Sequence, residues 1–83
     1  MNNELSQIFD EMAAVLELTG ANRFRVNAHA RVARVLKELV TDVTDIAPDK
    51  LTDIEGIGDG SAKKILEYIS TGHIEEHREL LAQ

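Results

Sequence analysis

Apolar residues recur at intervals of three and four along most of this 83-residue chain. This spacing is typical of amphipathic helices. It predicts a first helix from about Asn3 to Leu18, stopped by Gly20, and a second that begins near Phe24 and buries residues as far as Val40. No stretch alternates apolar and polar residues with a period of two, so strands are not expected. The sequence therefore predicts an all-α protein.

The second half of the chain predicts shorter helices. Pro48 suits the first turn of a helix, and Gly72 suits a break between two helices. The predicted segments are a connection over 41–47 and helices over 48–53, 61–70 and 74–82. Connections this short favour antiparallel packing of neighbouring helices. We expect a compact bundle of four to five short helices that forms one domain over residues 1–83.

Composition restricts the class of protein further. The chain has no cysteine, which excludes disulfides and thiolate metal sites. It has no apolar run near the ~20 residues that cross a bilayer, and its polar start is not a signal peptide. We therefore expect a soluble monomer without membrane contact, in the cytoplasm or nucleoid of a bacterium.

The net charge of −6 at first argues against nucleic acid as a partner. The charges are segregated, however. A stretch from Gly20 to Lys37 contains no acid and carries Arg23, Arg25, Arg31, Arg34 and Lys37. Such a stretch would attract a polyanion. Alternatively, these cations pair with acidic neighbours in their own fold, and charge alone does not decide between the two.

Three glycines fall within five residues in Gly56-Ile57-Gly58-Asp59-Gly60, directly before a predicted helix. Glycine permits positive φ and lets another molecule approach the backbone. The helix that follows offers unpaired N–H groups and the positive end of its dipole, which together attract anions. Ile57 is expected to fill the gap between the two helices and hold the loop rigid.

The order apolar–x–Gly–apolar–Gly, followed by Ala62 and Ile65, is the pattern of a helix-hairpin-helix motif. Such motifs grip the DNA backbone without reading its sequence. The alternative is an ordinary turn between helices, but the flanking helices and the apolar spacing favour the motif. We expect bulkier residues at Gly56 and Gly58 to weaken DNA binding and to leave the fold mostly intact.

Three segments extend this pattern to a resemblance over nearly the whole chain. They are the "N-x-F-R" opening of the second helix at 22–25, the glycine hairpin, and "E-Y-I-x-T-G" at 67–72. From Glu4 to about Leu81 the chain resembles the N-terminal domain of family X DNA polymerases, of the DNA polymerase beta type. The resemblance implies a helical bundle that binds gapped or single-stranded DNA with a 5′-phosphate, in DNA repair or gap-filling synthesis.

The resemblance also implies a set of site residues. Those expected at DNA phosphates are Gly56, Ile57, Gly58, Gly60, Ser61, Lys63, Lys64, Arg25, His29 and Arg31. A monovalent cation, K⁺ or Na⁺, often accompanies the hairpin in that family and would lie at the backbone of Ile54, Gly56 and Gly58; no other cofactor is implied. Related domains are tethered to a polymerase core. The carboxylates of such a core are absent here, so this chain alone cannot transfer nucleotides.

Some members of that family are also 5′-deoxyribose phosphate lyases. Lys64 matches the lysine that forms a Schiff base with the sugar. An attacking amine must be neutral, which desolvation or a neighbouring cation such as Lys63 would favour.

The sequence departs from the lyases around the phosphate pocket. It has Gly60 where active relatives have a lysine and His29 where they have a tyrosine. Glu75 and Glu76 follow where a lyase would better tolerate basic residues. The sequence thus favours DNA-backbone binding over catalysis by Lys64 and leaves enzyme activity open. A third alternative is a protein-interaction module with an acidic surface and a purely structural hairpin.

Overall fold

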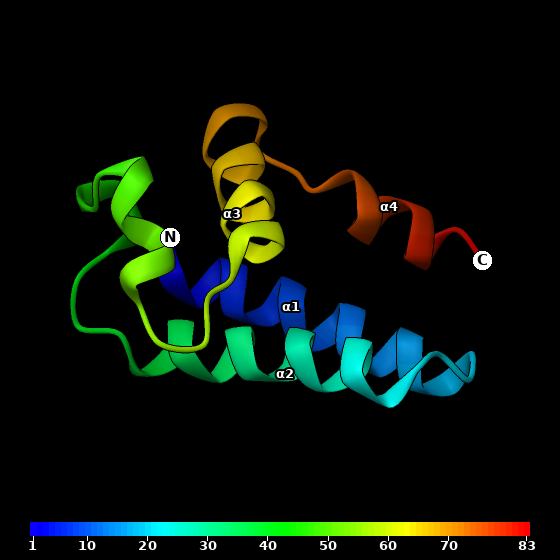
Figure 1. Ribbon diagram of the computed structural model, residues 1–83. Helices are drawn as coiled ribbons and strands as arrows, with labels where there is room; N and C mark the ends of the chain where they lie inside the picture. The colour runs from blue at the N-terminus through cyan, green and yellow to red at the C-terminus, as the bar shows by residue number, and fades with distance from the viewer.

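The computed structural model describes all 83 residues. It contains four α-helices, two short 3-10 helices and no strands (Figure 1). The elements are α1 (Asn2–Leu18), α2 (Arg23–Glu38), η1 (Val43–Asp45), η2 (Pro48–Asp53), α3 (Asp59–Thr71) and α4 (Glu75–Leu81). The prediction of an all-α fold is confirmed. No helix combines the length and the apolar character that a membrane crossing requires.

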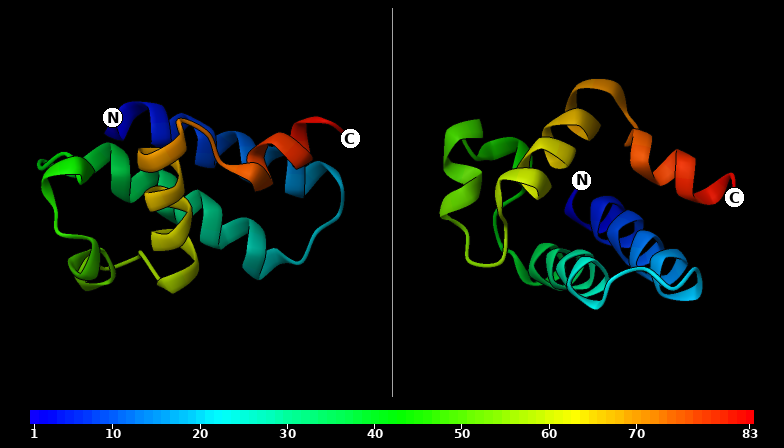
Figure 2. Two further views of the ribbon diagram at one scale, coloured as in Figure 1. Left: turned by 90° about the horizontal axis from the view of Figure 1, so that it is seen from above. Right: turned by 45° about the vertical axis from the view of Figure 1, so that its right-hand side comes forward.

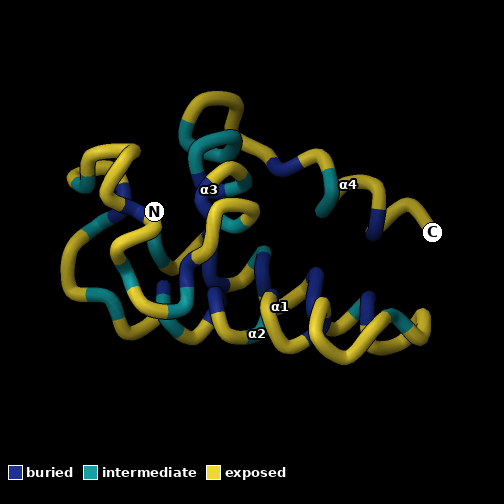
Figure 3. Tube along the Cα trace, viewed as in Figure 1, coloured by how far each residue is buried: buried dark blue, intermediate teal, exposed yellow.

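Helices α1 and α2 run antiparallel, and their interface is the most extensive in the protein (Figures 1 and 2). Their facing sides are buried, whereas their outer sides are exposed (Figure 3). The large apolar side chains that are fully buried in this interface are Leu5, Phe9, Met12 and Leu16 from α1 and Val32 and Leu36 from α2. They follow the predicted helical spacing, so burial of this stripe explains why both segments are helical.

Helix α3 lies across the α1–α2 pair and contributes buried Ala62 and Ile65 to the same core. Its Tyr68 hydroxyl donates a hydrogen bond to Oε2 of Glu4 at 3.0 Å, which joins α3 to α1. Helix α4 is held by the buried side chains of Ile74 and Leu80. The core therefore gathers on one side of α2 and leaves the other side to solvent.

The predicted extent of the second apolar stripe is wrong at its end. Helix α2 ends at Glu38 and Leu39 has extended backbone angles, so Val40 points away from the core and is 98% exposed. The predicted connection over 41–47 contains the single turn η1. Asp42 caps this turn, because its Oδ1 accepts a hydrogen bond from the Thr44 amide at 3.0 Å.

Candidate nucleic-acid interface

The loop between η2 and α3 packs its backbone directly on α2. The Ile57 amide donates to the Ile54 carbonyl at 3.0 Å, and the Ile57 side chain is buried, as expected for a residue that fills the gap. Gly56 has φ of +96°, and a Cβ atom there would lie only 2.8 Å from Cγ2 of Val35. Gly56 is therefore required for the close approach of the loop to α2.

The two hairpin glycines have different roles, which corrects one expectation. A bulkier residue at Gly56 would be strained and would collide with Val35 of α2, so it would destabilise the fold. A Cβ atom at Gly58 would have no neighbour within 4 Å, and the Gly58 backbone is extended. The expectation that a bulkier residue weakens DNA binding without disturbing the fold therefore remains a prediction for Gly58 alone.

The beginning of α3 presents a run of free backbone amides. Gly58 is the N-cap residue and supplies no side-chain cap. The amides of Gly58, Asp59, Gly60 and Ser61 have no acceptor within the protein, since the first backbone bond of the helix runs from the Ala62 amide to the Gly58 carbonyl. Residues 58–60 are exposed. These N–H groups and the helix dipole suit an anion.

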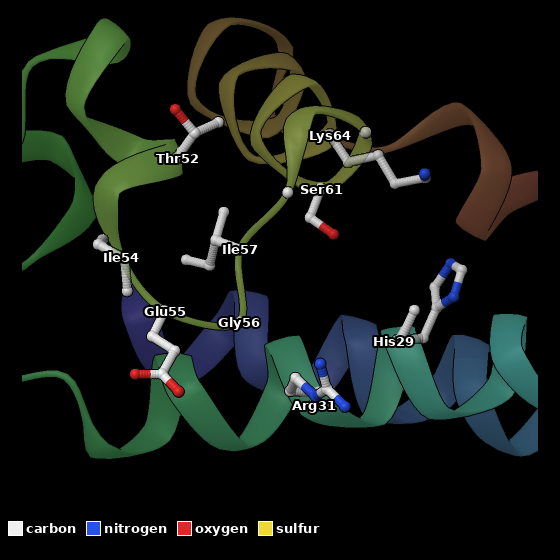
Figure 4. Close-up of a pocket in the computed structure, with 12 residues that line it drawn as sticks. His29, Arg31, Thr52, Ile54, Glu55, Gly56, Ile57, Ser61 and Lys64 are labelled. Atoms are coloured by element: carbon white, nitrogen blue, oxygen red, sulfur yellow. The ribbon is translucent and has the colours of Figure 1, made fainter.

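A pocket of about 560 Å³ lies between the hairpin, the middle of α2 and the start of α3 (Figure 4). The predicted site residues that line it are Gly56, Ile57, Gly58, Gly60, Ser61, Lys64, His29 and Arg31. Arg25 and Lys63 do not line it. Sequence reasoning missed Thr52, which reaches the pocket from η2.

Arg31 lies beneath Gly56 and also lines a second pocket, of about 470 Å³, with Arg34 and Glu55. Arg31, Arg34 and Lys37 form no ion pair within the protein. Of the five clustered cations, only Arg23 and Arg25 pair with acids, at 3.5 Å from Glu17 and 3.0 Å from Glu76. The fold thus leaves most of this charge available to a partner.

Glu76 of α4 gathers three of the predicted site residues. Its Oε2 lies 3.0 Å from Nη2 of Arg25, and its Oε1 lies 2.7 Å from Nε2 of His29 and 3.9 Å from Nζ of Lys64. Burial opposes ionisation of Glu76, but hydrogen bonds from His29 and Arg25 and the charge of Lys64 outweigh it. The pKa of Glu76 consequently lies below its ordinary value of 4.5.

Two hydrogen bonds fix the orientation of the His29 ring. Nδ1 faces the Arg25 carbonyl oxygen at 2.8 Å, and Nε2 faces the ionised Glu76 carboxylate. Both partners are hydrogen-bond acceptors, so each ring nitrogen of His29 faces an oxygen that can accept a hydrogen bond. Only 8% of the His29 side chain is exposed. His29 is therefore a buried imidazole that both hydrogen bonds hold in place beside the pocket.

Lys64 is partly enclosed by the pocket. Its side chain is 26% exposed and extends toward the side of the pocket where His29 lies (Figure 4). Lys63 is exposed and unpaired. Spacing along the sequence carried no signal for the role of Glu76, because its partners Lys64 and His29 lie 12 and 47 residues away.

A short helix, a glycine hairpin with a buried isoleucine and a helix with free N-terminal amides together define a helix-hairpin-helix unit. The chain belongs to the helix-hairpin-helix domain family, whose model matches residues 1–74. A comparison with curated proteins found no match. Domains of this family are generally associated with DNA binding that does not depend on sequence, which supports the predicted DNA-binding motif.

Proposed function

We propose that this protein binds the sugar–phosphate backbone of gapped or single-stranded DNA next to a 5′-phosphate. The role would be DNA repair or gap-filling synthesis, within or beside a family X polymerase. The observation that carries the proposal is the run of four free amides at residues 58–61, beside a pocket that the unpaired Arg31 also lines.

These groups suit phosphates better than bases. Backbone amides and an arginine donate hydrogen bonds to phosphate oxygens, which are the same at every nucleotide. Binding of this kind positions the DNA strand without selecting a sequence. It also releases counterions, so affinity should fall steeply as salt rises.

We also propose a monovalent cation at the hairpin, because three of its carbonyl oxygens retain free lone pairs. The Gly56 carbonyl accepts no hydrogen bond within the protein. The Ile54 and Gly58 carbonyls each accept one, from the Ile57 and Ala62 amides, and each retains a second lone pair. These three oxygens would hold K⁺ or Na⁺, whose charge would offset that of the nearby Glu55 toward a phosphate.

Lyase activity at Lys64 is a second candidate, favoured by the position of Lys64 in the same pocket as the hairpin. Attack on the sugar requires the neutral amine. The Glu76 carboxylate at 3.9 Å attracts the charged ammonium instead. The contacts of Lys64 therefore support phosphate binding better than catalysis.

The test is fluorescence anisotropy of a labelled, gapped duplex at several salt concentrations. We expect binding whose logarithmic affinity decreases linearly with the logarithm of salt, and equal affinity for gapped duplexes of different sequence. Affinity that is independent of salt, or that changes strongly with sequence, would show that the hairpin does not act as a backbone clamp.

A further inference from the structure

The Glu76 carboxylate occupies the place where basic side chains from two helices meet. Arg25 and His29 come from α2, Lys64 comes from α3, and all three contact this one carboxylate. Glu76 itself lies in α4, beyond residues 1–74 that match the family model. Arg25, His29 and Lys64 thus lie within the matched region, whereas the Glu76 carboxylate that they contact lies outside it.

The cluster carries more positive charge than Glu76 supplies negative charge. The cations of Arg25 and Lys64, together with the His29 imidazole, face one carboxylate, so the centre keeps an excess of positive charge. A terminal phosphate carries about −1.5 to −2 charges and three acceptor oxygens, whereas a carboxylate carries one charge and two oxygens. The same three side chains would therefore attract a terminal phosphate more strongly than a carboxylate of equal access.

The cluster remains arranged for an anion without Glu76. His29 is held by the bond from its Nδ1 to the Arg25 carbonyl, which does not involve α4. Glu76 is half-buried and sits on a helix of seven residues. Helix α4 has its own attachment through Leu80 and through His77, whose Nε2 lies 2.9 Å from Oε1 of Glu11. Rotation of the Glu76 side chain would empty the cluster while α4 stays in place.

We propose that Glu76 is an internal competitor for a terminal phosphate at the Arg25–His29–Lys64 cluster. In the free protein the carboxylate holds the mutually repelling cations of Arg25 and Lys64 and the His29 imidazole together, and a phosphate monoester enters by displacing it. The assignment of that phosphate to a DNA 5′ end rests on the proposed function. The competition itself concerns only the anion and these side chains.

The test is NMR on the isotope-labelled full chain, titrated with inorganic phosphate at fixed pH and ionic strength. The side-chain carboxyl ¹³C of Glu76 and the imidazole ¹⁵N of His29 report the displacement. We expect both signals to shift together and to saturate in the wild type. In Glu76→Gln the His29 signal should saturate at a phosphate concentration roughly threefold to tenfold lower, because the competing charge is gone.

Glu75→Gln is the matched control, because it removes the same charge from the same helix. Glu75 is exposed and lies 3.7 Å from Arg78, outside the cluster. Its substitution should leave phosphate affinity within about twofold. Equal tightening by the two substitutions would show an effect of net charge alone and would overturn the proposal.

The wild-type titration decides even if Glu76→Gln fails to fold. A Glu76 carboxyl signal that stays fixed while phosphate binds, or no binding of phosphate at all, overturns the competition. DNA binding by the hairpin is tested in a second titration, which follows the Gly58 amide signal with a gapped duplex that carries a 5′-hydroxyl and so has no terminal phosphate. Failure of that second measurement would overturn the proposed function and leave the phosphate result intact.

Discussion

Nε2 of His29 lies 2.7 Å from Oε1 of Glu76 although 47 residues separate the two. This contact joins the middle of α2 to the last helix beside the pocket. With Arg25 and Lys64 on the same carboxylate, it links the stability of the fold to the charge of the candidate site.

Gly56 and Gly58 should respond differently to substitution. Gly56→Ala combines a strained positive φ with a contact of 2.8 Å to Val35, so it should lower the free energy of unfolding by about 2 kcal/mol. Gly58→Val should change it by only about 0.5 kcal/mol and should weaken DNA binding by roughly fivefold to thirtyfold, by obstructing the free amides. Urea denaturation and anisotropy measure the two quantities. A Gly58→Val protein that binds DNA as tightly as wild type would remove the α3 amides from the interface.

Arg31 should contribute to DNA binding through its charge. It has no ion pair in the protein and lines both pockets beside the hairpin. Arg31→Gln should weaken binding of every DNA sequence alike and reduce the slope of log affinity against log salt by about 1. Lys50 is a matched control, being exposed and unpaired in η2 but outside both pockets. An equal effect of Lys50→Gln would indicate general charge attraction rather than a defined site.

Stability toward acid should depend on Glu76. Its pKa is below the ordinary value of 4.5 in the folded protein, so its contribution is present above about pH 4.5 and is lost as pH falls through the lowered pKa. Between pH 5 and pH 3, about the range in which carboxyl groups titrate, the free energy of unfolding should therefore fall less in Glu76→Gln than in the wild type. Glu75→Gln should keep the wild-type slope. Urea denaturation across this pH range makes the comparison, and parallel curves for Glu76→Gln and wild type would contradict it.

Borohydride should trap little or no adduct between the wild-type protein and a DNA that carries an abasic 5′ end. The reason is that Nζ of Lys64 is engaged in an ion pair with Glu76 at 3.9 Å, which has to break before the amine can attack the sugar. Lys64→Ala gives the background for the measurement. An adduct that forms with wild type and disappears in Lys64→Ala would establish the lyase activity and show that the ion pair does not prevent attack.

Much of the fold could be predicted because local patterns determine it. The spacing of Leu5, Phe9, Met12 and Leu16 defines α1, and Pro48 begins η2 where its fixed φ suits a first turn. Val40 was predicted to be buried because it continues the spacing of the apolar stripe of the second helix. Helical spacing no longer predicts burial beyond the end of the helix, and nothing in the local pattern shows that α2 ends at Glu38.

The site was less predictable because it depends on contacts between distant segments. The glycines at 56 and 58 look alike in the sequence, and only the folded structure shows that Gly56 has a positive φ and lies against Val35 whereas Gly58 has neither constraint. Glu76 counted as an unfavourable charge near the hairpin. Its pairing with His29 and Arg25 follows from the packing of α4, which spacing along one helix cannot reveal.

The most direct test of backbone binding is an NMR titration of the ¹⁵N-labelled chain with a gapped duplex, once with a 5′-phosphate and once with a 5′-hydroxyl. We expect the largest amide shifts at residues 56–61 and around Arg31 with both duplexes, and additional shifts near His29 and Lys64 with the phosphorylated one. These shifts should diminish as salt is raised. A spectrum that does not change with either duplex, or shifts confined to the outer face of α1, would contradict DNA binding by the hairpin and favour a protein-interaction module.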